Sequence, residues 1–186
     1  SRFNPPVSKA ENRSTRKGYI MWGRHVPYKR FDLAIEACNK LKLPLIISGT
    51  GPETKRLKAM AGPTITFVGR APDDELLNLA HNADAFLFPG EEDFGIAPVE
   101  AIAAGLPVIA YKAGGALDYV REKESGTFFK EQTVESLSKC LSAFNSGSYT
   151  RKKVSSIADE FSTEKFAASV SKFVNEKFQA QRSTNE

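Results

Sequence analysis

The sequence contains little cysteine and no long hydrophobic run. Its two cysteines, Cys38 and Cys140, lie in separate apolar segments without a neighbouring cysteine or histidine at metal-ligand spacing. This pattern favours buried, reduced thiols over a disulfide or a zinc site, and it suits the reducing cytoplasm. No apolar stretch approaches the roughly 20 residues that a membrane-spanning helix needs, and the first residues lack the hydrophobic region of a signal peptide. We therefore expect a soluble, cytoplasmic domain.

A strong charge of one sign is also missing. The chain has 26 basic and 22 acidic residues, which give a net charge of +4 at pH 7. Such a small excess suits a phosphate-bearing ligand or an anionic membrane surface, but it does not predict nucleic-acid binding. No GxxxxGK[ST] phosphate loop is present, which excludes the P-loop NTPases. The only histidines, His25 and His81, have no nucleophile motif or HExxH partner nearby, so surface or packing roles are favoured over catalysis.

Short apolar runs alternate with helical patterns along the chain. Six candidate strands lie at residues 19–22, 45–47, 65–68, 85–88, 108–111 and 127–129. This alternation predicts an α/β fold: a Rossmann-like, doubly wound parallel sheet of about six strands with helices on both faces, followed by C-terminal helices. The length of 186 residues suits about one domain. We expect residues 1–17 to form a linker and residues 18–186 to form the domain.

Two details of the helices can also be predicted. Asp73 or Asp74 is suited to cap the helix that follows it, because a carboxylate accepts hydrogen bonds from the free amides of a first turn. In the last segment, Phe166, Val170 and Phe173 share one helical face with Val174. Such a stripe is more typical of a helix packed on a core than of a membrane-binding helix.

Residues suited to a sugar nucleotide follow the carboxyl ends of the predicted strands. In chain order they are Arg24 with Lys29, Thr50 with Gly51, Arg70, residues 92–97, and Gly114 with Gly115. In a parallel sheet these ends share one edge, where ligands bind. Cations and free backbone amides hold phosphate, and carboxylates bind hydroxyl groups. The pattern therefore predicts a sugar-nucleotide site at this edge.

Each of these signals has a simpler explanation. Arg24 and Lys29 are also compatible with a solvated basic loop. Residues 49–52 are more typical of a tight turn than of a dinucleotide fingerprint, because they follow the second strand and not the first. The acids at residues 91–93 offer hard oxygen ligands for a metal ion. A metal is not required, however, since Arg24 and Lys29 can already neutralise a diphosphate.

The segment from Glu92 to Glu100 joins a strand to a helix. If Pro98 is the first helical residue, Glu100 is the third, where free amides favour a carboxylate without any ligand. Glu92 has no such explanation. Gly95 permits close backbone approach, and the amides of residues 95–97 would form an anion cradle at the start of the helix.

Taken in order, these motifs resemble the C-terminal, nucleotide-binding domain of retaining GT-B glycosyltransferases of the group 1, or family 4, type. The matching motifs are Gly23-Arg24 with Lys29, residues 48–52, residues 67–70, the E-x7-E pair Glu92 and Glu100, residues 104–108, and Gly114-Gly115. Residues 27–30, 91–96 and 114–117 are most similar to bacterial and archaeal mannosyltransferases of the O-antigen type. The resemblance implies one half of a GT-B fold that transfers a hexose, here mannose from GDP-mannose, to a polysaccharide or lipid-linked acceptor.

The resemblance also implies roles for individual residues. Arg24 and Lys29 would bind the donor diphosphate, and Glu92 would contact hydroxyls of the transferred sugar; these form the catalytic set. The donor-binding residues would be Gly51, Arg70, Phe94, Gly95, Ile96 and Glu100. Among them, Glu100 would bind the ribose, the backbone near Arg70 the base, and the amides of residues 94–96 the sugar and phosphate. No metal or other cofactor is implied.

A GT-B enzyme also has an N-terminal, acceptor-binding domain, and the 17 residues before the first strand leave no room for it. We therefore expect this chain to bind a donor but to be inactive in transfer by itself, and the full enzyme to suit peripheral association with the inner face of the cell membrane. An alternative for the terminal helix from Phe161 onward is that it packs toward the missing domain and leaves an exposed apolar patch on this chain. Two other functions stay open from the sequence. One is a sugar-nucleotide epimerase with a GT-B-like fold, and the other is a non-catalytic module that binds a sugar nucleotide or nucleic acid.

Overall fold

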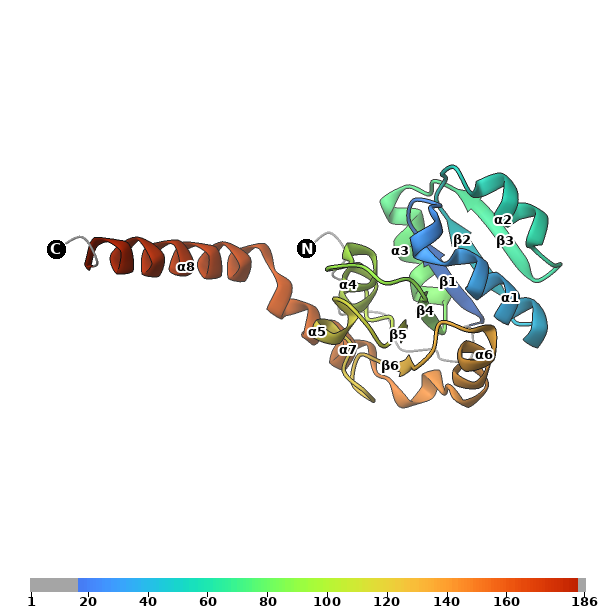
Figure 1. Ribbon diagram of the computed structural model, residues 1–186. Coiled ribbons are helices and arrows are strands. Elements are labelled where there is room, and N and C mark those ends of the chain that lie inside the picture. The colour runs from blue at the N-terminus through green and yellow to red at the C-terminus, as the bar shows by residue number, and fades with distance from the viewer. Residues whose placement is uncertain (1–16, 184–186) are drawn as a thin grey trace.

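Six parallel strands form one sheet in the order β3-β2-β1-β4-β5-β6. The computed structural model describes residues 17–183 and is shown in Figure 1. Its strands are β1 (Tyr19–Trp22), β2 (Leu45–Ser48), β3 (Ile65–Gly69), β4 (Ala85–Phe88), β5 (Val108–Tyr111) and β6 (Gly126–Phe129). The strand order reverses between β1 and β4, as in other doubly wound sheets. The predicted fold class and all six strands are confirmed.

Helices cover both faces of this sheet. They are α1 (Phe31–Leu41), α2 (Thr54–Met60), α3 (Asp73–Asn82), α4 (Ile96–Ala103), α5 (Ala116–Tyr119), α6 (Val134–Ala143), α7 (Arg151–Ala158) and α8 (Thr163–Ser183), with 3-10 turns η2 (Pro27–Lys29), η3 (Ser146–Ser148) and η4 (Asp159–Phe161). Because side chains alternate along a strand, Ile20 packs with α3, α4, α5 and α7, whereas Met21 packs with α1, α2 and α6. Two cores therefore flank the sheet.

The cysteines belong to these helices and are free thiols. Cys38 is buried in α1, and burial raises its pKa to about 12. Cys140 in α6 is half-buried, and burial raises its pKa to about 11 with a smaller contribution from Glu122. Both thiols are therefore protonated at neutral pH and suited to packing, as predicted.

Two predicted helix starts are wrong by one or two residues. Helix α3 begins at Asp73 after Pro72, so Asp73 and Asp74 lie in the first turn and not at the cap. Helix α4 begins directly after Gly95, whose φ of 82° is accessible to glycine. Pro98 is consequently the third helical residue, where its missing N–H has no helical partner to lose, and Glu100 is the fifth. The first-turn amides therefore do not explain Glu100.

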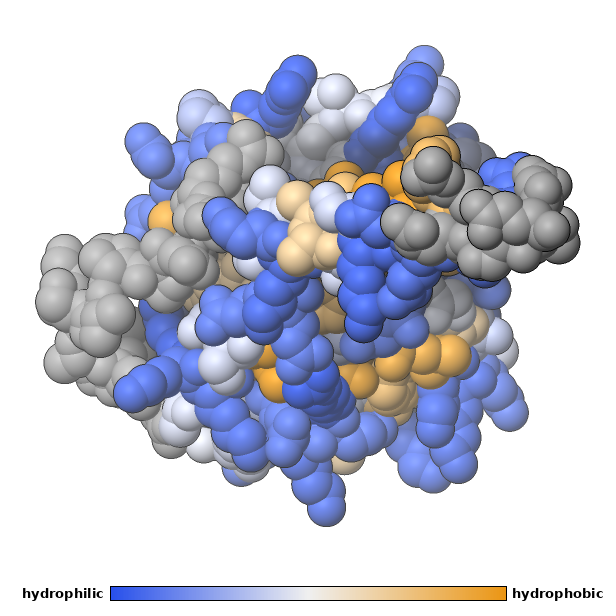
Figure 2. Space-filling view, turned by 90° about the vertical axis from the view of Figure 1, so that its left-hand side faces the viewer, coloured by the Kyte–Doolittle hydropathy of each residue, from blue (hydrophilic) through white to orange (hydrophobic). Residues whose placement is uncertain are grey.

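Helix α8 departs from the core position that its apolar stripe predicted. It projects away from the domain (Figure 1), and Phe166, Phe173 and Phe178 are 68%, 59% and 58% exposed. The stripe expected in a core is not part of one, because other helices already cover both faces of the sheet. Figure 2 views the side toward which α8 projects and shows hydrophobic residues at the surface among hydrophilic ones.

Two further findings concern membrane-spanning helices and the expected linker. Within residues 17–183, no helix combines the length and the apolar composition that crossing a bilayer requires. The linker expected at residues 1–17 lies, apart from Lys17, outside the described residues.

Candidate functional site

The loops after β1 and β4 are packed backbone to backbone where the strand order reverses. A Cβ atom on Gly90 would lie 2.6 Å from the carbonyl oxygen of Tyr28 and 2.8 Å from the Cα of Lys29. Such distances exclude any side chain, so a glycine is required at this contact. In doubly wound sheets the crevice at this reversal is the usual ligand site. The candidate site is therefore formed by two loops that far-apart parts of the sequence supply.

An ion pair joins these two loops. Lys29, at the end of η2, lies with its Nζ 2.5 Å from Oε1 of Glu92, and each side chain is only 16% exposed. A lysine ammonium has three N–H donors, so Glu92 leaves two of them for a ligand. The second carboxylate oxygen of Glu92 can accept a hydroxyl hydrogen. One location thus offers a cation for phosphate and an acceptor for a sugar hydroxyl.

Glu100 is oriented by the end of β1. The indole Nε1 of Trp22 donates a hydrogen bond to Oε2 of Glu100 at 3.2 Å. Trp22 is buried, and its ring packs edge-on against Phe86 with centroids 4.3 Å apart. Sequence reasoning missed this contact, although a signal was available. The only tryptophan of the chain ends a buried strand at the ligand edge, and a buried indole N–H needs an acceptor.

The start of α4 presents free backbone amides next to Glu92. The N–H groups of Gly95 and Ile96 lie at the end of the helix that has no internal acceptors. Phe94 and Ile96 are exposed, and the Phe94 ring contacts Tyr119 edge-on with centroids 6.0 Å apart. The amides and the positive end of the helix dipole favour an anion at this position.

The glycines after β5 support the acidic loop. The N–H of Gly115 donates to the carbonyl oxygen of Glu92 at 2.8 Å. A Cβ on Gly114 would lie 2.4 Å from the same oxygen. These two residues therefore hold the backbone of Glu92, and the Gly115 amide is already engaged.

The remaining predicted residues lie around this centre. Arg24 is exposed in the loop after β1, and Arg70 is exposed after β3, the edge strand two positions away from β1. Gly51 packs against the loop after β1, and its N–H donates to Oγ1 of Thr54 at 2.8 Å. The structure thus brings together Lys29, Glu92, Glu100 and the start of α4, with Arg24 at the rim, Arg70 farther along the sheet, and the Gly51 amide used within the fold.

His25 has a packing role, one of the two roles favoured from the sequence. It is fully buried, with its ring centroid 4.8 Å from that of Phe31 and 5.9 Å from that of Phe67. Its Nδ1 lies 2.9 Å from Oγ1 of Thr54, so it connects the loop after β1 to the start of α2. Burial lowers the pKa of the imidazole below its ordinary value, which keeps the ring neutral at pH 7.

The three acidic residues of the loop after β4 lie in different environments. Glu92 is paired with Lys29, whereas Glu91 and Asp93 are exposed. In the part of the chain that the structure describes, no group of three or more histidine, cysteine, aspartate or glutamate residues is arranged to hold a metal ion.

Comparison with known proteins places this geometry in a family. Residues 6–161 match the family described as "Glycosyl transferases group 1". A GDP-mannose-dependent alpha-mannosyltransferase of Corynebacterium glutamicum is 35% identical over 105 residues, which cover 56% of this chain and 25% of that protein. A sulfoquinovosyl transferase of Arabidopsis thaliana is 33% identical over 166 residues, which cover 85% of this chain and 32% of that protein. The chain therefore spans a minor part of the length of these relatives.

The fold is shared with solved structures of GT-B glycosyltransferases. The sucrose-phosphate synthase from Thermosynechococcus elongatus superimposes with a TM-score of 0.80 at 22% identity, over 96% of this chain and 51% of that chain. At this identity the likeness concerns the fold alone. The family match, in contrast, extends over most of the sequence and contains every residue of the site described above. The chain belongs to the group 1 glycosyl transferases.

Proposed function

We propose that this chain is the donor-binding domain of a retaining glycosyltransferase that transfers mannose from GDP-mannose to a polysaccharide or lipid-linked acceptor. The observation that carries the proposal is the meeting of Lys29, Glu92 and Glu100 with the free amides of α4 where the strand order reverses. The diphosphate, the sugar and the ribose of a donor each find a matching group there. GDP-mannose is supported by the corynebacterial relative, whose name gives that donor.

The cations and amides act on the leaving group. As the glycosidic bond of the donor breaks, negative charge accumulates on the diphosphate oxygens. Lys29 and the amides at the start of α4 are in place before the reaction, and Arg24 lies in the same loop as Lys29, so these groups stabilise the charge more in the transition state than in the ground state. This difference in stabilisation is the main source of rate acceleration in the proposal.

The two glutamates orient the donor. Glu92 accepts hydroxyl hydrogens of the sugar, and Glu100, held by Trp22, accepts those of the ribose. In retaining glycosidases a carboxylate can act as the nucleophile. We assign Glu92 to orientation, because its ion pair with Lys29 stabilises the carboxylate and weakens it as a nucleophile. The acceptor is bound by a second domain that closes over this edge and excludes water, so the chain alone binds donor and transfers poorly.

Isothermal titration calorimetry tests this proposal with GDP, GDP-mannose, UDP-glucose and a short DNA duplex. GDP-mannose should bind with a Kd on the order of micromolar. Lys29→Ala and Glu100→Gln each remove a charged hydrogen-bonding partner, so each should weaken binding about tenfold or more. The matched control is Lys40→Ala, since Lys40 is an exposed lysine of α1 that pairs with Glu135 at 3.6 Å. It should bind the donor like the wild type.

The outcomes separate the class of protein from the choice of donor. If the folded protein binds no sugar nucleotide, or if DNA binds in preference to all of them, the glycosyltransferase proposal is wrong. Tighter binding of UDP-glucose than of GDP-mannose would overturn only the choice of mannose. Thermal melting of each variant shows whether a loss of affinity reflects unfolding.

A further inference from the structure

Arg30 has an unfavourable backbone conformation next to the candidate site. It lies between η2 and α1 with φ 52° and ψ 41°, the left-handed region that residues with a Cβ avoid. Its neighbour Lys29 carries the ammonium that meets Glu92. The direction in which the chain leaves Lys29 therefore depends on Arg30, and strained residues of this kind persist only where their surroundings hold them.

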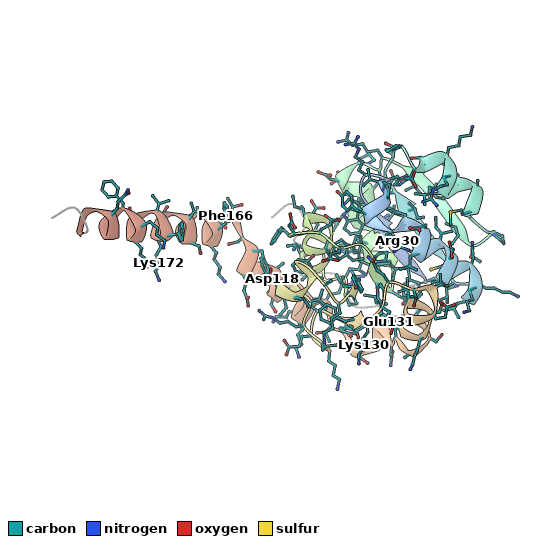
Figure 3. All side chains as sticks on the ribbon, viewed as in Figure 1. Arg30, Asp118, Lys130, Glu131, Phe166 and Lys172 are labelled. Atoms are coloured by element: carbon teal, nitrogen blue, oxygen red, sulfur yellow. The ribbon has the colours of Figure 1, made fainter. Side chains whose placement is uncertain are left out.

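Two hydrogen bonds hold the Arg30 side chain. Its Nε donates to Oδ1 of Asp32 at 3.2 Å, within the first turn of α1. Its Nη1 donates to Oε1 of Gln132 at 3.3 Å, across a separation of 102 residues. Figure 3 labels Arg30 and also Glu131, the residue that precedes Gln132. The second bond thus connects the loop after β1 to the loop after β6.

Gln132 also reaches the loop after β4. Its Nε2 donates to the carbonyl oxygen of Pro89 at 2.9 Å. Pro89 is buried and directly precedes Gly90, the glycine that contacts the backbone of Lys29. One amide side chain therefore accepts from the loop that carries Lys29 and donates to the loop that carries Glu92.

We propose that Gln132 and Arg30 form a clamp that positions Lys29 against Glu92. Both are positioning residues that act through the loops and do not contact the donor. The amide chemistry is specific, because a single side chain must accept from a guanidinium and donate to a carbonyl. A carboxylate could serve only the guanidinium, and an apolar side chain could serve neither. The inference rests on the proposed function, since the positioned pair is the one assigned to the donor.

The test compares Gln132→Ala, Arg30→Ala, the double variant and Gln132→Glu with the wild type. Glu131→Ala is the matched control, because Glu131 is the exposed neighbour of Gln132. Amide hydrogen exchange without ligand reports the order of residues 27–30 and 90–95. Calorimetry with GDP reports the affinity, and thermal melting reports global stability.

Gln132→Ala should accelerate exchange in residues 90–95 and weaken GDP binding, each about fivefold, without a matching loss of thermal stability. Because Gln132→Ala already removes both bonds of the clamp, the double variant should bind GDP about as weakly as Gln132→Ala alone. Gln132→Glu should keep slow exchange in residues 27–30 but accelerate it in residues 90–95. If Gln132 only stabilised the fold, its replacement by glutamate would not accelerate hydrogen exchange in one loop and leave it slow in the other.

The proposal is overturned if Gln132→Ala leaves exchange in residues 90–95 and GDP affinity at wild-type values, or if Glu131→Ala changes them equally. Additive losses in the double variant also contradict a clamp. If the wild type binds no GDP, the proposed donor is wrong, and the exchange data still decide whether the clamp orders the loops.

Discussion

At Gly95 the chain needs both a left-handed backbone and free space beside the Cα. Its φ is 82°, and an added Cβ would lie 2.6 Å from Oη of Tyr119. Tyr119 is fully buried, and burial raises the pKa of its phenol, which therefore stays neutral. A buried ring in α5 cannot easily move away. Gly95 thus determines where α4 begins, and with it the position of the free amides.

Gly95→Ala should lower the free energy of unfolding by about 2–4 kcal/mol, because backbone strain adds to a steric clash. Gly69→Ala is the matched control: its φ is 69°, but an added Cβ would meet nothing within 4 Å. This substitution should lower the free energy of unfolding by only about 1 kcal/mol, because it adds backbone strain without a clash. Urea denaturation measures both values, and equal losses would show that the contact with Tyr119 is unimportant.

Residues that follow strand ends could be predicted from sequence, whereas their partners could not. Lys29 and Glu92 each follow an apolar run, and in a parallel sheet such positions must share an edge. The bond from Trp22 to Glu100 joins residues 78 positions apart, and that from Gln132 to Pro89 joins residues 43 apart. No local pattern contains such pairs, because they depend on how the loops pack in three dimensions.

At the scale of elements, the strands were easier to predict than the helix starts. The central strands β1 and β4 are buried on both faces and therefore appear as short apolar runs. Helix α4 was misplaced because Pro98 is typical of a first helical position, yet a proline is equally tolerated within the first turn. Helix α8 was placed in a core because its stripe of phenylalanines has helical spacing, which says nothing about where the partner surface is.

Deleting residues 163–186 should leave the thermal midpoint of the domain within about 2 °C of the wild type, because α8 buries little apolar surface against it. Figure 3 shows Phe166 and Lys172 on opposite sides of the helix, so an apolar face stays exposed. Binding of a hydrophobic dye should fall with its removal. As a control, Leu137→Ala in the buried face of α6 should lower the free energy of unfolding by about 2–4 kcal/mol. A large loss of cooperativity on deletion would show that α8 does pack on the domain.

At the scale of the whole molecule, the strand order places every candidate residue at one edge of a single sheet. This arrangement follows from the alternation of strands and helices, so the fold class was predictable. Seven shorter helices cover both faces of the sheet, so α8 does not pack on either face. That outcome depends on the complete packing and could not be read from the stripe itself.

Stability should depend on pH through His25. Burial lowers its folded-state pKa below 6.5, so the unfolded chain binds a proton at a higher pH than the folded protein does. The contribution is fully present above pH 6.5 and is lost as pH falls toward the folded pKa. Between pH 7.5 and 5.5 the free energy of unfolding should therefore decrease more steeply in the wild type than in His25→Asn. Urea denaturation across this range measures both slopes, and equal slopes would contradict the assignment.

The pairing of Lys29 with Glu92 has a consequence for selectivity. Without a ligand, the ammonium already faces an internal anion at 2.5 Å, so its attraction for any small anion in solution is largely neutralised. Inorganic phosphate could reach the two N–H donors that Glu92 leaves, but it would gain little from a cation whose charge is already balanced. A molecule that carries hydroxyl groups next to a phosphate can bind these N–H donors and the free carboxylate oxygen of Glu92 at once. We therefore expect the site with the closed ion pair to bind glycosyl phosphates more tightly than simple anions.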